Sequence, residues 1–287
     1  MFSEYRVRDA LSGREAQAAL GLRNTWHPAD DFKLFTTFER IQPVNDIGQE
    51  TTAATIGGEY LISPLTKAAA RIEYRTSQSE DSILNTLALA RKLNLDWTVL
   101  GKNTIAWSDR DGTGLLVRDR IRLGFAYRDT DTNRWIWLGR YEARYDRDEG
   151  QGSRRLVHIV STNLNYQPVK SVVLAGRWAS KFVDERFTEL SADSNTHLVS
   201  ARATFDVTEK IDIGLQASNL FSGGFGSNQY GVGAEAGYLL TSNLWLSGGY
   251  NFFGFRDDDL EDQDYTRQGP YVRLRFKFDE DLFKFLE

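Results

Sequence analysis

Charged side chains recur at every second position in several stretches of this 287-residue sequence. Arg120 and Arg122 are two residues apart, and the same spacing separates Arg140, Glu142 and Arg144. Because residues two apart in an extended chain point to the same side, the first stretch builds a row of cations, and the second builds a row of cations broken by a carboxylate. Such a row makes and breaks no covalent bonds, but it can sort ions by the sign of their charge.

Residues that usually carry catalysis or bind metals are scarce. The sequence has no Cys and three His: His27 lies in a turn-like segment, His158 among apolar residues and His197 at the start of an alternating segment. A site built on His197 with Asp193 or Glu189 is the enzymatic alternative that the spacing leaves open. Clusters of His and Cys with metal-ligand spacing are absent. We therefore expect no enzymatic activity, no cofactor and no bound metal.

The elements that position the charged rows are extended strands. Apolar and polar residues alternate over about sixteen segments, most of them about 10 to 14 residues long, and no helical pattern interrupts them. Soluble strands usually have about five or six residues, whereas longer ones suit a tilted crossing of a bilayer. The segments begin near residues 2, 14, 32, 51, 66, 83, 97, 115, 134, 154, 170, 196, 210, 228, 243 and 268.

The connections between these segments predict an up-and-down arrangement. Short, turn-like links at 27–30, 63–65, 94–96, 129–132, 167–168, 208–209 and 241–243 alternate with longer polar ones at 42–49, 76–82, 109–114, 146–153, 183–195, 222–227 and 255–266. Alternate connections of such a sheet lie at opposite ends. We expect an all-β fold, a closed antiparallel up-and-down transmembrane β-barrel of about sixteen strands over 1–278, with a short tail at 279–287.

Composition narrows the alternatives. Aromatic residues make up 13% of the chain, and Trp and Tyr gather near strand ends, as at Trp26, Tyr60 and Tyr74, where rings suit the level of lipid headgroups. A soluble β-sandwich or propeller is the alternative, but the strands are long for a sandwich and no propeller repeat is present. The net charge of −5 argues against nucleic acid as a partner. The first residues lack an export leader, so we expect a mature or excised domain, or else a cytoplasmic protein.

The closing stretch YVRLRFKF, residues 271–278, resembles the last strand of bacterial outer-membrane β-barrels, which alternates apolar residues and ends on Phe. The stretches SGREAQAALGLRN and YVRLRFKFDEDLF are similar, more specifically, to the C-terminal barrel of large multi-domain Gram-negative envelope proteins. This resemblance implies an outer-membrane location with periplasmic termini. It also implies contact with the lipid bilayer and lipopolysaccharide, and recognition of the last strand by the barrel-assembly machinery.

A barrel of about sixteen strands encloses water rather than a packed core. We therefore expect a passive pore for ions and small solutes with a mild anion preference. In one alternative, Arg and Glu simply pair across strands and keep the interior wet; in another, the barrel anchors a large envelope protein and conducts only incidentally. The acidic run at 257–264 could bind divalent cations, narrow the entrance or remain a solvated loop. The predicted pore-lining residues are Lys33, Arg71, Lys102, Arg120, Arg122, Arg140, Glu142, Arg144, Arg177, Arg202, Glu235, Arg273, Arg275 and Lys277.

Overall fold

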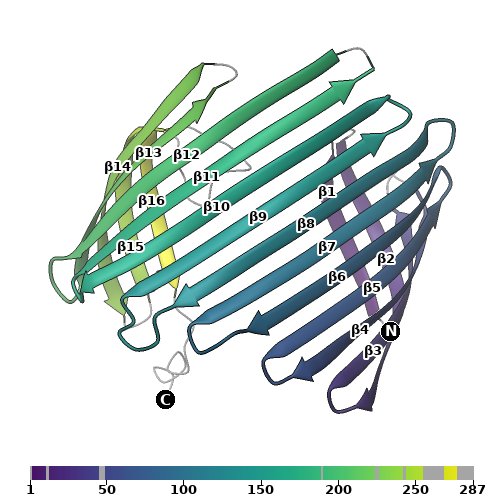
Figure 1. Ribbon diagram of the computed structural model, residues 1–287, viewed down its shortest axis with the longest axis horizontal. Helices are drawn as coiled ribbons and strands as arrows, with labels where there is room; N and C mark the ends of the chain where they lie inside the picture. The colour runs from purple at the N-terminus through teal and green to yellow at the C-terminus, as the bar shows by residue number, and fades with distance from the viewer. Residues whose placement is uncertain are drawn as a thin grey trace. The chain divides into compact units, whose positions relative to one another are not determined.

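The computed structural model describes residues 2–10, 13–44, 49–188, 190–223, 226–241, 244–254 and 268–276. Each strand is hydrogen-bonded to the next in chain order, from β1 to β16 (Figure 1). The strands are β1 (Phe2–Ala10), β2 (Gly13–Ala29), β3 (Phe32–Pro43), β4 (Thr51–Ser63), β5 (Thr66–Ser77), β6 (Glu80–Lys92), β7 (Trp97–Arg110), β8 (Gly114–Arg128), β9 (Trp135–Asp148), β10 (Ser153–Val169), β11 (Val172–Phe187), β12 (Leu190–Asp206), β13 (Ile211–Ser222), β14 (Ser227–Thr241), β15 (Leu244–Phe253) and β16 (Gly269–Phe276).

The predicted all-β architecture of about sixteen antiparallel, up-and-down strands is confirmed. Most strands begin within three residues of the expected positions, because strict alternation of side chains is a reliable mark of a strand. The exception is β12, which begins at Leu190 rather than near residue 196. Closure of the ring between the first and last strands stays a prediction, and so does the division into a barrel at 1–278 and a tail at 279–287.

Two connections expected to be long are short instead. At 76–82 the strands continue to Ser77 and from Glu80, and at 183–195 strand β11 runs to Phe187 while β12 starts at Leu190. Backbone hydrogen bonds hold paired strands together. A strand can therefore continue through a segment with polar side chains on both faces, provided that both faces contact water. The regular alternation of short and long connections is therefore wrong. The segments 255–266 and 279–287 lie outside the described residues.

The link predicted at 129–132 is a turn between β8 and β9, but it extends over 129–134. The amide of Thr132 donates to Asp129 Oδ1 at 3.0 Å, and the amide of Asn133 donates to the carbonyl of Asp129 at 3.0 Å. Asn133 takes a positive φ of 53°, which asparagine tolerates better than most residues. The Thr132 hydroxyl bound to the Asp129 carboxylate, together with neighbouring amides, lowers the pKa of Asp129 below its usual value.

The strands present two chemically different faces, here called the apolar face and the polar face. The apolar face carries large side chains that remain accessible, such as Leu20 at 62%, Ile72 at 51% and Leu274 at 63% exposure. The polar face carries Glu73, Glu142 and Glu235, whose side chains are buried among neighbouring side chains. Soluble monomers rarely expose apolar side chains in such continuous rows. The apolar face therefore requires an apolar surrounding.

The chain divides into two compact units. The first unit consists of 1–125, 141–158 and 183–192, and the second of 126–140, 159–182 and 193–287. The first contains the charged groups of β5, β8 and the second half of β9; the second contains those of β12, β14 and β16. Among the described residues, no helix is long and apolar enough to cross a membrane.

Candidate functional site

Buried glutamates surrounded by arginines organise the polar face of both units. The side chains of Glu73, Glu142 and Glu235 are only 8%, 1% and 4% exposed. A carboxylate this deeply buried is stable only where cations and hydrogen-bond donors replace its hydration. Each glutamate contacts at least two arginines, and each group is called here by its glutamate: the Glu73, Glu142 and Glu235 clusters.

The Glu142 cluster joins β8 and β9 in the first unit. Arg144 Nε donates to Glu142 Oε1 at 2.7 Å, and Arg122 Nε lies 3.3 Å from Oε2. Arg120 Nε completes the cluster at 3.7 Å from Oε1. The arginines are more accessible than the glutamate, with side-chain exposures of 49%, 42% and 24% for Arg120, Arg122 and Arg144. Three cations thus surround one carboxylate and keep water-accessible ends.

The Glu73 cluster repeats this pattern on β4 and β5 of the same unit. Arg75 donates to Glu73 Oε1 at 2.8 Å, and Arg71 pairs with Oε2. The hydroxyl of Thr55, whose residue is paired across the strands with Glu73, donates to Oε2 at 3.3 Å. Both arginines lie two residues from Glu73, so the alternation of a single strand is enough to bring the three charges together.

The Glu235 cluster gathers side chains from β12, β14 and β16 in the second unit. Arg202 pairs with Glu235 Oε1, and Arg273 Nη1 lies 3.6 Å from Oε2. The hydroxyl of Tyr271 donates to Oε2 at 3.0 Å. The three strands are not directly paired with one another, so the side chains of this cluster must reach across β13 and β15.

Glycines make that reach possible. Glu235 is paired with Gly214 on one side and Gly249 on the other. A Cβ atom at Gly214 would lie 2.9 Å from Glu235 Cγ, and one at Gly249 would lie 2.4 Å from Tyr271 Cζ. The missing side chains leave room for Glu235 and Tyr271 to lie flat along the sheet.

The structure places the described members of the predicted pore-lining set on their expected strands and brings eight of them into clusters. Glu142 gathers Arg120, Arg122 and Arg144, Glu235 gathers Arg202 and Arg273, and Arg71 joins Glu73. Lys277 lies outside the described residues. The remaining predicted residues lie outside the three clusters, on β3, β7, β9, β11 and β16: Lys33, Lys102, Arg140, Arg177 and Arg275.

Four cluster members, Thr55, Glu73, Arg75 and Tyr271, were not among the predicted pore-lining residues. Arg75 follows Glu73 by two residues, so the alternation of β5 was a sufficient signal for it. Tyr271 precedes Arg273 by two residues and shares its face, but aromatic residues near strand ends suggest a place beside lipid headgroups instead. Its contact with Glu235 depends on the pairing of Tyr271 with Gly249, which composition alone does not reveal.

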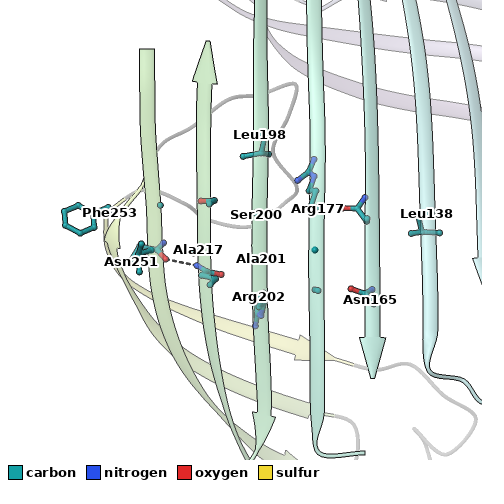
Figure 2. A pocket seen from close by; sticks show the side chains of 17 residues that line it. Leu138, Asn165, Arg177, Leu198, Ser200, Ala201, Arg202, Ala217, Asn251 and Phe253 are labelled. Atoms are coloured by element: carbon teal, nitrogen blue, oxygen red, sulfur yellow. Dashed lines mark hydrogen bonds between the residues drawn. The ribbon is translucent and has the colours of Figure 1, made fainter. Parts of the chain in front are cut away.

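A hollow of about 400 Å³ lies on the polar face of the second unit. It crosses β9 to β15, and Figure 2 shows Asn165, Arg177 and Ser200 on neighbouring strands of it. The dashed line in Figure 2 marks the bond of 2.9 Å that Gln216 Nε2 donates to Asn251 Oδ1. Gly233, paired with both residues, permits this bond, because a Cβ there would lie 2.5 Å from Asn251 Oδ1.

Among the described residues, His158 and His197 form no recognisable catalytic site. His197 Nδ1 is 2.8 Å from the hydroxyl of Ser180, and the ring lies between Phe182 and Phe221, with centroid distances of 5.6 and 5.0 Å. Ser180 is completely buried, so its hydroxyl cannot reach the carbonyl of a substrate. His158 Nδ1 is similarly held, 2.8 Å from the hydroxyl of Tyr141. Of the two carboxylates considered with His197, Asp193 is exposed and Glu189 lies outside the described residues.

No protein-family model and no curated protein sequence matches this chain. Solved structures show the similarity instead. The siderophore receptor PirA from Pseudomonas aeruginosa aligns with a TM-score of 0.61 at 11% identity, covering 79% of this chain and 44% of the receptor. The ferric-catecholate import receptor Fiu from E. coli aligns with a TM-score of 0.53 at 11% identity, covering 92% of this chain and 51% of the receptor. The chain thus spans about half the length of these receptors. It has the fold of Gram-negative outer-membrane β-barrels.

Proposed function

We propose that this chain forms a water-filled, passive, non-enzymatic pore for ions and small solutes in the outer membrane of a Gram-negative bacterium, with a mild preference for anions. The excess of arginine over glutamate in the clusters of the polar face carries the proposal. Two arginines face one carboxylate in the Glu73 and Glu235 clusters, and three face Glu142. Counting these members alone, every cluster keeps one or two positive charges.

The position of the polar face supports the same proposal. In transmembrane barrels the strands alternate between residues that face lipid and residues that face a wet interior. The accessible rows of the apolar face suit the lipid side, so the clusters belong on the water side. There, the exposed ends of the arginines would raise the local concentration of anions. Contacts with lipopolysaccharide and recognition of the last strand by the barrel-assembly machinery belong to the same proposal, as do periplasmic termini.

The reversal potential of the refolded protein in a planar bilayer with a KCl gradient tests the anion preference. We expect chloride to be more permeant than potassium, and the double variant Arg120→Gln/Arg122→Gln to reduce that preference, because it removes both excess charges of the Glu142 cluster. Arg147→Gln is the matched control, since Arg147 pairs with Glu149 at 3.3 Å and alternation places it on the opposite face of β9. A cation-selective or unselective wild-type pore contradicts the proposal.

A membrane anchor with incidental conductance is the second candidate, and the connections of the sheet favour it. A porin usually narrows its passage with a long inward loop, and the two longest connections that the sequence predicts are 183–195 and 255–266. The second of these lies outside the described residues. Strand residues occupy most of the first. Among the connections described throughout, the longest is 129–134, with six residues. Solute flux into liposomes separates the two candidates: saturable flux supports a solute pore, whereas flux that rises linearly with concentration supports the anchor.

A further inference from the structure

The hollow on the second unit differs in chemistry from the three clusters. Its polar lining consists mainly of amides and hydroxyls, including those of Asn163, Asn165, Ser200 and Ser218. Among the described residues that line it there is no aspartate or glutamate. The described lining of the hollow therefore offers neutral hydrogen-bonding groups and cations, and the Glu235 carboxylate beside Arg202 is paired with that arginine.

These neutral side chains are available to a solute. Within the described part of the chain, the side chains of Asn163, Asn165, Ser200 and Ser218 have no hydrogen-bond partner, and none of the four is buried. An amide provides two donors and an acceptor, and a hydroxyl provides both a donor and an acceptor. This combination matches the hydroxyl groups of a sugar, each of which donates one hydrogen bond and accepts others.

Arg177 adds a cation to this neutral surface. It projects from β11 between the strands that carry Asn163 and Ser200 (Figure 2). A guanidinium has five N–H donors, so it can bind a planar carboxylate through two of them while others keep contacts within the protein. The second arginine of the hollow, Arg202, pairs with Glu235. Arg177 lies between the strands that carry the amides and hydroxyls, and this position suits it to distinguish an acid from its neutral analogue.

We propose that the hollow binds a small hydroxylated monocarboxylate of the sugar-acid class, with its carboxylate on Arg177 and its hydroxyl groups on the neighbouring amides and hydroxyls. The volume of about 400 Å³ lies in the range of small-molecule sites. Leu138 and Phe253 also line the hollow and provide apolar surface for the C–H groups of a ring. The inference rests on the proposed pore, since solute must reach the polar face.

Titration calorimetry of the refolded protein in detergent micelles, with sodium D-galacturonate and neutral D-galactose as probes, tests the site. We expect galacturonate to bind about 10- to 100-fold more tightly than galactose, the range that a hydrogen-bonded charge contributes. Arg177→Gln should remove this difference, whereas Asn165→Ala should weaken both probes. Arg186→Gln is the control, because it makes the same change nine residues further along β11, at a side chain that is 59% exposed and paired with Asp184.

Heat-modifiable gel mobility must first show that each variant folds. Equal affinity for the two probes, no binding of either, or equal affinities of Arg177→Gln and Arg186→Gln for galacturonate would overturn the proposal. Conductance is measured on the same preparations and keeps the two proposals apart. An anion-preferring pore without galacturonate binding refutes the hollow alone, and galacturonate binding without conductance refutes the pore alone.

Discussion

Replacing Glu142 by Gln should destabilise the folded protein while strengthening the proposed preference for anions. The side chain is 1% exposed, and it accepts a 2.7 Å hydrogen bond from Arg144, whose side chain is 24% exposed. A charge-assisted hydrogen bond in such a setting contributes about 1.5 to 3 kcal/mol. Arg120 and Arg122 are 49% and 42% exposed, so their pairs count as surface ion pairs of about 0.2 to 1 kcal/mol each. The amide of Gln retains part of the first bond, which leaves an expected loss of about 2 to 3 kcal/mol.

Urea unfolding of the protein in lipid vesicles, followed by tryptophan fluorescence, measures that loss. Glu149→Gln is the matched control: its side chain is 45% exposed and 3.3 Å from Arg147, so a change below about 1 kcal/mol is expected. Reversal potentials should move further toward chloride in Glu142→Gln, because three arginines then lack their carboxylate. The reasoning is refuted if Glu142→Gln unfolds like Glu149→Gln, or if the variant becomes less selective for anions.

Two further predictions concern the sheet and one of its turns. Gly57→Ala should cost about 1 to 3 kcal/mol of stability, because the added Cβ would lie 2.4 Å from Cζ of Phe35. Gly248→Ala is the control, because its Cβ would meet no atom within 4 Å and the change should be nearly neutral. The two variants are compared by the temperature at which the heat-modifiable gel band shifts. Asp129→Ala should lower the unfolding midpoint at neutral pH. The folded-state pKa of Asp129 is lowered, so its contribution is present above the usual aspartate pKa of about 3.9 and is lost as pH falls through the folded value. The two proteins should therefore converge in urea titrations as the pH falls below about 4, and a constant difference would contradict this.

The alternation of side chains was enough to predict the strands and the charged face. Two-residue spacing is a geometric property of a strand, so Arg71 and Glu73 had to share a face wherever their strand lay. Side-chain contacts between strands could not be predicted from the sequence, because they depend on the register of strand pairing. The meeting of Arg202 with Glu235 requires knowing that Arg202 pairs with Gln216 and that Glu235 pairs with Gly214.

The positions where some strands end were also predicted incorrectly. The segment 183–195 is polar and contains several acidic residues, which suggested a loop, yet β11 and β12 occupy most of it. Polarity reports contact with water, and a paired strand above a membrane meets water on both faces. The hollow was not predicted, for a related reason. Asn and Ser at alternate positions indicate only that one face of the strand contacts water. Whether the small residues beside them leave a hollow depends on the residues paired with them on the neighbouring strands.

The side chains of Glu235 and Tyr271 lie flat over the glycines paired with them, and this arrangement should affect the noise of the single-channel current. A guanidinium that swings into a conducting passage interrupts the current briefly and appears as excess noise. Arg202 and Arg273 are held against a carboxylate that itself has little freedom to turn. The open-level current of the wild-type protein should therefore be quiet, and Glu235→Gln should make it flicker without changing the number of conducting molecules.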